Sequence, residues 1–312
     1  MNTPTSRFFV AVDCPLCGSP DYIVLVPSKY HDDMVDAELR GLYSASSDHV
    51  LLDQIVRCRS CDLIYVNPRI DSKLIIEGYS GAADPGFVAN NLERISTFRR
   101  VLIRICRRLG LTPSPHHRIL DVGCAGGAFP KAAADLGFQV TGVEPSAWLA
   151  EFGRQKYNID VRQGVLQADM FPPASFDIVT MWDVVEHLTN PHEVLTIISA
   201  LLREDGWLIV NYPDVGSLAA RCLRSYWPFW LSVHLIYYTR TTIARQLERA
   251  GFDIVHAQPH WQRLKLSYVL FRASQYFSVF SSLKRVADRI GIGEVPVTYN
   301  MGQTLIVARK RR

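Results

Sequence analysis

The chain has 312 residues, of which 48% are hydrophobic and 21% are charged. These fractions are typical of soluble globular proteins and exclude a disordered chain, a collagen-like fibre and a coiled-coil rod, while the length predicts one large domain with a smaller one. Thirty-four Lys and Arg residues against thirty Asp and Glu give a net charge of +4, too small an excess to indicate nucleic acid by itself. We find no secretion signal and no run of about 18 apolar residues, so we expect a cytoplasmic protein without a transmembrane segment.

Two Cys-x-x-Cys pairs, Cys14 with Cys17 and Cys58 with Cys61, lie in the first part of the chain. Each pair can present two thiolates to one ion, and two pairs complete a tetrahedral site in which sulfur fills every position. We therefore predict a structural zinc ion in a zinc-ribbon-like module that covers residues 1–70. Two other interpretations stay open: four unrelated buried thiols, and a redox-active pair.

A helical connector is predicted over residues 71–117. Apolar residues recur at helical spacing from Leu92 to Leu109, and arginines occupy much of the remaining surface of this helix. We interpret the arginine-rich face as solvated, with contact to an acidic partner as the alternative.

From Arg118 onward the sequence alternates between strand-like and helical segments. Strands are predicted at 118–122, 139–143, 176–181, 207–211, 252–257 and 304–308, and helices at 129–136, 146–157, 191–202 and 241–250. Alternation of this kind is typical of an α/β fold, with a largely parallel sheet and helices on both of its faces. We assign residues 118–312 to this domain. Its segments 212–240 and 262–298 are expected to lie on the substrate side of the binding site or to form a lid over it.

The most informative segment is the turn that follows Asp121. Three glycines lie between Gly123 and Gly127, and glycines let the backbone pass close to a ligand where a helix begins. A dinucleotide site needs glycine in the middle of the G-x-G-x-x-G/A pattern, where this chain has Ala125. The carboxylate of Asp121 suits a cofactor with an ammonium and a sulfonium group, and Glu144 can accept hydrogen bonds from two ribose hydroxyls. Together these residues favour S-adenosylmethionine over a nicotinamide cofactor.

The segment Leu120-Asp-Val-Gly-Cys-Ala-Gly-Gly127 resembles motif I of the class I S-adenosylmethionine-dependent methyltransferases, and Val143-Glu-Pro145 resembles the end of their second strand. Cys61-Asp-Leu-Ile-Tyr-Val-Asn-Pro-Arg69 is similar to the bacterial subgroup with an N-terminal zinc-binding segment. The resemblance implies a Rossmann-like sheet of seven strands, the last of them antiparallel. It also implies these cofactor-binding residues: Asp121, Gly123, Cys124, Ala125, Gly127, Glu144, Pro145, Gln167 and Asp183.

The adenine contact departs from the family pattern. Many relatives carry an acidic residue just after the glycine of the third-strand segment, where this chain has Val165 and Leu166. We therefore expect Gln167 or Asp169 to meet the adenine amino group.

Four residues are candidates for catalysis: Asp183, Glu186, His187 and His234. Methyl transfer needs alignment and exclusion of water, and a hydroxyl acceptor must also lose a proton. The spacing Asp183-x-x-Glu186-His187 resembles the divalent-ion motif of ubiquinone-pathway O-methyltransferases, which implies Mg²⁺ there as one interpretation. Two others stay open, namely His187 as a base without metal, and Glu186 and His187 as supports of the following turn. His234 lies in an aromatic segment that forms either a wall for the acceptor or a packed lid.

The leading hypothesis is a methyltransferase whose acceptor is a small molecule, such as a sugar, a glycan precursor or a specialised metabolite, methylated on a hydroxyl or a sugar carbon. The alternatives are a zinc-ribbon protein that binds nucleic acid or methylates RNA, which the low net charge disfavours, and a nicotinamide oxidoreductase. The apolar stretch 264–286 is interpreted as a core or dimer helix, with peripheral contact to a membrane near a lipid-linked acceptor as the alternative.

Overall fold

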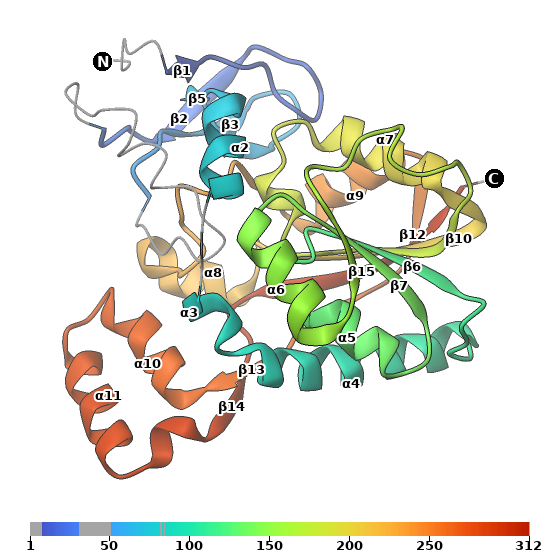
Figure 1. Cartoon of the computed structure of the whole chain (residues 1–312). Helices are drawn as coiled ribbons and strands as arrows, with labels where there is room; N and C mark the ends of the chain where they lie inside the picture. The colour runs from blue at the N-terminus through green and yellow to red at the C-terminus, as the bar shows by residue number, and fades with distance from the viewer. Residues whose placement is uncertain (1–7, 31–50, 82, 84, 312) are drawn as a thin grey trace.

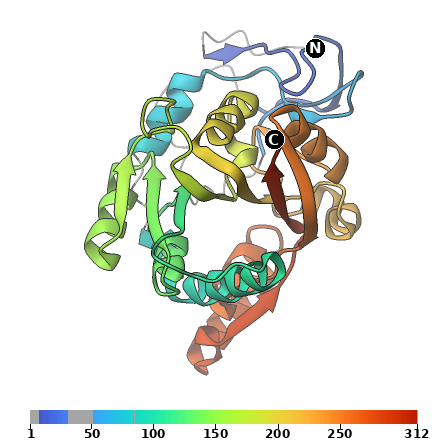
Figure 2. The same ribbon diagram turned by 90° about the vertical axis from the view of Figure 1, so that its right-hand side faces the viewer.

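The computed structural model describes residues 8–30, 51–81, 83 and 85–311. Its centre is a seven-stranded sheet in the order β12-β15-β10-β9-β6-β7-β8, in which only β15 is antiparallel to its neighbours (Figures 1 and 2). The strands are β6 Arg118–Val122, β7 Gln139–Glu144, β8 Asp160–Gln163, β9 Phe176–Trp182, β10 Leu202–Pro213, β12 Phe252–Pro259 and β15 Gln303–Lys310. The predicted fold class and the antiparallel last strand are confirmed.

Helices cover both faces of this sheet (Figure 1). On one face lie α4 Asn91–Leu109 and α5 Ala128–Ala134, and on the other lie α7 Pro191–Leu201 and α9 Arg240–Arg249, while α6 Ala147–Tyr157 follows β7. Successive side chains of a strand point to opposite faces. Ile119 accordingly packs in one buried cluster with Leu102 of α4, and Leu120 in another with Leu195 of α7.

The N-terminal module is built on a four-stranded antiparallel sheet in the order β11-β4-β3-β2. Its first three strands are β2 Tyr22–Val26, β3 Ile55–Cys58 and β4 Ile64–Val66, whereas β11 is Ile236–Tyr237, from the methyltransferase-like part of the chain. A separate pair joins β1 Phe9–Val10 to β5 Arg69–Ile70. The sheet of the N-terminal module therefore includes a strand from beyond the predicted boundary at residue 70.

A small lobe projects from the body at residues 262–299, which we call the hairpin lobe (Figure 1). It contains β13 Gln262–Lys265, α10 Leu266–Ser274, α11 Val279–Arg289, the 3-10 helix η3 Ile292–Glu294 and β14 Pro296–Tyr299. Within α10 and α11 only Ala287 is buried. The interpretation of this stretch as a core helix is wrong, because too little of its apolar surface is covered.

The remaining elements connect these parts. They are α2 Ser72–Gly81, α3 Pro85–Val88, α8 Leu218–Leu223 and the 3-10 helices η1 Val185–His187 and η2 Arg224–Tyr226. Among the described residues, no helix has the length and apolar character needed to cross a bilayer.

Candidate active site

A cavity of about 800 Å³ opens at the carboxyl ends of β6, β7 and β9. One end is formed by the glycine-rich turn and Glu144, the middle by Asp183 and His187, and the far end by α10 and Phe280 of α11. Ligands of open α/β sheets bind at this edge. The cavity therefore joins the predicted cofactor residues to the predicted catalytic residues in one continuous space.

The turn after β6 is held by backbone hydrogen bonds to the end of β7. The amides of Gly123 and Cys124 donate to the Val143 carbonyl at 2.8 and 3.1 Å, and the amide of Ala125 donates to Glu144 Oε2 at 2.7 Å. Gly123 has a φ of +70°, and a Cβ built there would lie 2.6 Å from Val184 Cγ2. Glycine is required at this position both for the backbone conformation and for the close approach.

Two buried carboxyl groups face the cofactor end of the cavity. Asp121 is 2% exposed and accepts a hydrogen bond from the Thr180 hydroxyl at 2.5 Å, while Glu144 is 6% exposed. Burial raises the pKa of Glu144 to about 7 and raises the pKa of Asp121 well above its usual range. A positively charged ligand stabilises the ionised form of such groups. The site is therefore suited to a cationic cofactor.

All of the predicted cofactor residues except Gly127 line this cavity. Gly127 instead precedes α5 with a φ of +79°, and a Cβ there would lie 3.3 Å from the backbone of Gly153. Of the two residues considered for the adenine contact, Gln167 lines the cavity and Asp169 does not.

Asp183 lies directly after β9 in a left-handed conformation, with a φ of +54°. Its Oδ1 accepts hydrogen bonds from Asn211 Nδ2 at 2.6 Å and Gln303 Nε2 at 2.8 Å, and its Oδ2 lies 3.5 Å from Gln262 Nε2. Burial raises the pKa of Asp183 to about 6. The two short hydrogen bonds to Oδ1 fix the orientation of the carboxyl group.

Glu186, His187 and His234 form a compact cluster at the middle of the cavity. One ligand-type atom of each lies within 4.8 Å of the others, and the two imidazole rings are 4.8 Å apart between centroids. Both oxygens of Glu186 lack a hydrogen-bond partner among the described residues. Burial raises the pKa of Glu186 well above its usual range. The sequence does not show that His234 joins this cluster, since it comes from a loop almost fifty residues after His187.

Backbone carbonyls set the tautomers of the two histidines. Nδ1 of His187 lies 2.8 Å from the Val233 carbonyl oxygen, and Nδ1 of His234 lies 2.8 Å from the Phe229 carbonyl oxygen. A carbonyl only accepts hydrogen bonds, so each Nδ1 carries the proton and each Nε2 keeps a lone pair. Burial lowers the pKa of His187 to about 4 and that of His234 well below its usual range. Both rings are therefore neutral bases near pH 7.

Several cavity residues carry no recognisable motif in the sequence. The hydroxyl of Tyr79, on α2, lies 2.8 Å from His187 Nδ1, and Gln303 reaches Asp183 from the last strand. Arg94 lines the cavity, donates to the Phe87 carbonyl and lies over the Phe87 ring, so the interpretation of this arginine as solvated is wrong. His260 is 2% exposed against Trp182.

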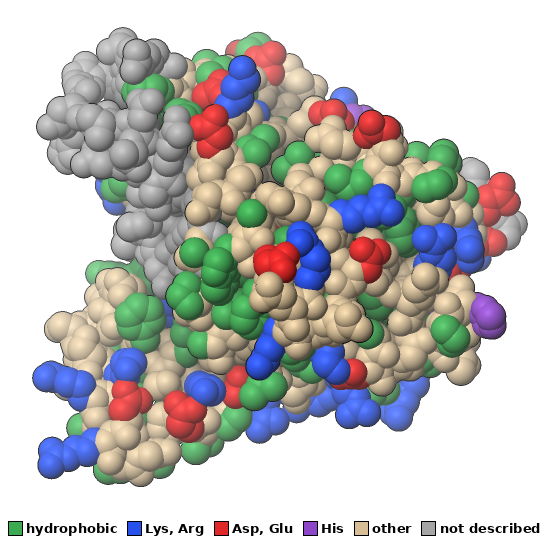
Figure 3. Space-filling model, in the orientation of Figure 1, with side chains coloured by type: hydrophobic (Ala, Val, Ile, Leu, Met, Phe, Trp, Pro, Cys, Tyr) green, Lys and Arg blue, Asp and Glu red, His purple; other side chains and the backbone are tan. Residues whose placement is uncertain are grey.

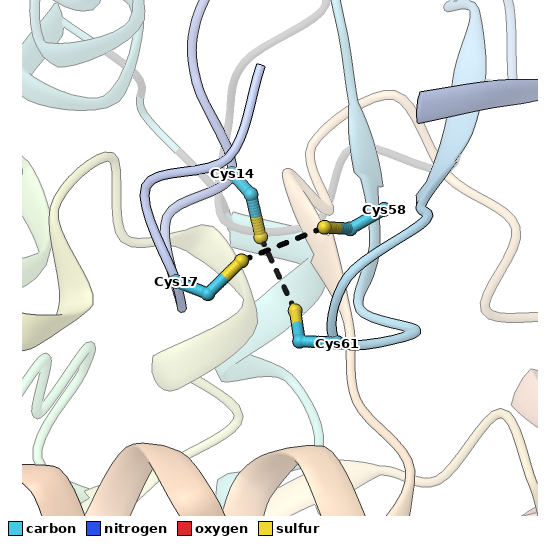
Figure 4. Close-up of side chains that lie close together, drawn as sticks. All are labelled: Cys14, Cys17, Cys58 and Cys61. Atoms are coloured by element: carbon cyan, nitrogen blue, oxygen red, sulfur yellow. Dashed lines mark hydrogen bonds between the residues drawn. The ribbon is translucent and has the colours of Figure 1, made fainter. Parts of the chain in front are cut away.

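The four N-terminal cysteines converge at one point (Figure 4). Their sulfur atoms all lie within 4.8 Å of one another, with 3.5 Å between Cys14 and Cys61 and between Cys17 and Cys58. A zinc ion with four Zn–S bonds of about 2.3 Å would hold its sulfur ligands about 3.8 Å apart. The donor set and its spacing fit tetrahedral zinc.

Comparison with known proteins agrees with this geometry. The chain matches the methyltransferase domain family over residues 94–257, more than half of its length. It belongs to the class I S-adenosylmethionine-dependent methyltransferases. This methyltransferase is 28% identical over 171 residues to a ubiquinone biosynthesis O-methyltransferase of Agrobacterium fabrum, which covers 49% of the chain and 68% of the relative.

Further relatives match over shorter regions. A protein of Maricaulis maris with the same name is 34% identical over 137 residues, which is 40% of this methyltransferase and 54% of the relative. One from Glaesserella parasuis is 33% identical over 104 residues, or 30% of this chain and 44% of the relative. The chain thus spans between 44% and 68% of these relatives. A candidate methyltransferase of Bacillus halodurans shares the fold, with a TM-score of 0.50 and 16% identity over 69% of this chain and 99% of that one.

Proposed function

We propose that the chain transfers the methyl group of S-adenosylmethionine to a hydroxyl group of a small molecule that carries an apolar part. The observation that supports this proposal is the single cavity shared by the motif I turn and by the Glu186–His187–His234 cluster. In-line displacement at the methyl carbon needs the acceptor oxygen opposite the sulfonium, and a hydroxyl must lose its proton to attack. A neutral imidazole in the same cavity supplies the proton acceptor.

The cofactor end supports binding of a cation. Asp121 and Glu144 line a largely apolar cavity, in which a carboxylate and a sulfonium attract one another more strongly than in water. The amides of Gly123, Cys124 and Ala125 donate hydrogen bonds to Val143 and Glu144, so the conformation of the turn is preorganised before the cofactor binds. We assign the methionine end to Asp121 and Gly123, and the ribose to Glu144.

Calorimetric titration with S-adenosylhomocysteine tests this assignment. Replacing Asp121 with asparagine keeps an acceptor for the Thr180 hydroxyl but removes the charge, so we expect affinity to fall about 10- to 100-fold, the range for loss of one charged hydrogen bond. Because burial already raises the pKa of Asp121, the amide should leave the melting temperature unchanged or higher.

Asp160 offers a matched control. It accepts a hydrogen bond from the Thr141 hydroxyl at 3.0 Å on the edge strand β8, and it does not line the cavity. Asp160→Asn should bind S-adenosylhomocysteine as the native chain does. Equal affinity in Asp121→Asn and Asp160→Asn would contradict the assignment of the motif I site.

Cofactor affinity should also depend on pH through Glu144. Its pKa of about 7 in the empty site means that the carboxyl group is largely protonated at pH 6 and largely ionised at pH 8. Only the ionised form accepts hydrogen bonds from both ribose hydroxyls, so affinity should rise with pH up to about 7 and then level off. Calorimetry at several pH values measures this, and the dependence should be weaker in Glu144→Gln, in which Asp121 is the remaining buried carboxyl group of the site. The same pH dependence in both proteins would exclude Glu144 as its source.

The acceptor end of the cavity is mostly apolar. Tyr226, Phe229 and Leu231 line it from one side, and Val269 and Phe280 of the hairpin lobe line it from another. Aromatic and aliphatic walls favour an acceptor with an aromatic or alkyl part, and the relatives from Agrobacterium fabrum and Maricaulis maris are ubiquinone biosynthesis O-methyltransferases. A bare sugar uses such a surface poorly, so the sugar or glycan acceptor stays a prediction with less support. RNA, the alternative acceptor, has less support because the net charge of the chain is only +4.

The divalent ion inferred by resemblance fits a different set of residues from the predicted one. Asp183 is held by Asn211 and Gln303, whereas Glu186, His187 and His234 offer one carboxylate and two imidazole nitrogens. Mg²⁺ prefers oxygen ligands, so this mixed set suits a transition metal better. When bound, such an ion would lower the pKa of an acceptor hydroxyl. A transition metal bound by these three residues is therefore our second candidate for activating the acceptor hydroxyl. The first candidate is proton removal by the histidines without a metal.

We also propose zinc at Cys14, Cys17, Cys58 and Cys61. Two arginines of α9 hold the loops that carry these cysteines, since Arg245 donates to the Cys61 carbonyl at 3.3 Å and Arg249 donates to the Leu16 carbonyl. All four ligand positions are sulfur, so the ion would be structural and would leave no position for a substrate.

A further inference from the structure

We propose that the outer face of the hairpin lobe docks on an anionic phospholipid bilayer and that the acceptor enters the cavity from that surface. The inference rests on the proposed function, because it supplies an amphiphilic acceptor to the same cavity. Its basis is an exposed apolar stripe on α11, basic side chains beside the stripe, and an opening of the cavity at the same lobe.

The apolar stripe consists of Val279, Leu283, Val286 and Ile290. At about 100° per residue these four side chains fall within an arc of about 60° on one side of α11. They are 58%, 47%, 56% and 63% exposed, so the body of the protein does not cover them. Eight of the nineteen large hydrophobic side chains that are exposed in the described residues belong to the lobe: Phe271, Phe277, Val279, Leu283, Val286, Ile290, Ile292 and Val295. Such a concentration marks an interaction surface.

The charge of the lobe indicates which kind of partner binds the apolar stripe. Residues 262–299 contain six basic and two acidic residues, an excess equal to the +4 of the whole chain. The two acidic residues pair with lysines, Lys265 with Glu294 and Lys284 with Asp288, so Arg285 and Arg289 add positive charge beside the stripe. Figure 3 shows hydrophobic and basic side chains together on this lobe, at the lower left. An apolar helix face flanked by Lys and Arg is the pattern of a helix that lies in the interface of an anionic membrane.

A second copy of this chain fits the surface less well. Two copies would bring the same positive charge together, and the cores of protein interfaces are depleted of lysine. An acidic bilayer instead complements both the charge and the apolar stripe. We therefore assign the surface to lipid.

The cavity opens at the same lobe. Tyr226 and Phe277 both line the cavity, are 52% and 46% exposed, and have ring centroids 5.1 Å apart. The ring centroid of Phe280, another lining residue on α11, lies 6.3 Å from that of Phe277. The apolar lining thus reaches the surface next to the stripe. An acceptor whose tail stays in the bilayer could present its hydroxyl to His187 and His234 without leaving the lipid completely.

Sedimentation with vesicles tests the proposal. We expect the native chain to bind phosphatidylglycerol-containing vesicles at least tenfold better than pure phosphatidylcholine vesicles, with weaker binding as salt rises from about 50 to 500 mM. Each basic residue near such a surface contributes about fivefold, so Arg285→Glu with Arg289→Glu should lower binding by at least about 25-fold. Leu283→Asp with Val286→Asp should lower binding to both kinds of vesicle.

Leu218→Asp is the matched control, because Leu218 is 76% exposed but lies outside the lobe and the cavity. It should bind vesicles as the native chain does. All variants should keep native affinity for S-adenosylhomocysteine, which separates this inference from the proposed function. Native cofactor affinity without vesicle binding would overturn the membrane surface and leave the methyltransferase site standing. A native dimer that Leu283→Asp dissociates, with no binding to lipid, would assign the stripe to a second copy and also overturn the proposal.

Discussion

Replacing His187 or His234 with alanine is expected to lower kcat for methyl transfer to a hydroxyl acceptor by about 10²- to 10⁴-fold, the usual contribution of a positioned base. The rings contact each other and share Glu186 as a neighbour, so they act as a unit, and the double variant should lose little more than either single one. Catechols with alkyl chains of increasing length serve as probe acceptors, with transfer of a labelled methyl group as the measurement.

His256→Ala is the control for this experiment, because His256 lies on β12 outside the cavity and contacts Gln258. It should retain native kcat, and all variants should bind S-adenosylhomocysteine normally.

At saturating cofactor, protonation of these rings should not lower kcat between pH 7 and pH 5, since burial lowers the pKa of His187 to about 4. Titration of either imidazole ring near pH 6.5, followed by NMR, would contradict the buried neutral base. Activity lost to a chelator at constant zinc content, and restored by a transition metal, would assign the step to the metal-bound form of the cluster.

Loss of zinc is expected to disorder the acceptor site while sparing the cofactor site. The strand β11 begins two residues after His234 and pairs with β4, and the Val66 amide donates to the Leu235 carbonyl at 2.9 Å. The Leu235 amide in turn donates to the Glu186 carbonyl at 2.9 Å. In Cys58→Ser, hydrogen exchange should therefore accelerate in a peptide covering residues 229–238, and remain slow in one covering 118–127.

Cys106→Ser provides the comparison, since Cys106 is also buried but lies on α4 and far from the other thiols in sequence. It should retain full zinc content and native exchange in both peptides. Cys58→Ser should bind S-adenosylhomocysteine with native affinity and lose methyl transfer. Full zinc stoichiometry in Cys58→Ser would contradict the four-cysteine site, and unchanged exchange at 229–238 would contradict the link to the acceptor loop.

The central sheet could be predicted because its signals are local. Buried strands such as 118–122 are short segments rich in Ile, Leu and Val, the glycine turn follows directly, and the observed strand β6 has the predicted bounds. The edge strand Asp160–Gln163 was missing from the predicted strands, since an exposed edge strand of four residues carries almost no apolar pattern. Most of the predicted cofactor residues line one cavity because they follow strand ends that lie together in sheets of this type.

The acceptor end could not be predicted because it depends on long-range contacts. Tyr79 reaches His187 across 108 residues, and β11 is a two-residue strand that no periodicity reveals. The apolar stretch 264–286 shows the limit most clearly. The stretch forms two helices, α10 and α11, where one was predicted, and spacing alone does not tell whether an apolar face is covered by protein or left exposed.

The four-stranded sheet has a consequence for how such enzymes can recombine. An N-terminal module exchanged between relatives at residue 70 would leave β11 to pair with a strand from another protein, and the native hydrogen bond between Val66 and Leu235 would be lost. A chimera that also transfers the stretch from Trp227 to Tyr238 keeps that edge and its histidine together. The structural unit that must be exchanged is therefore a discontinuous one, made of the first seventy residues and a short segment far downstream.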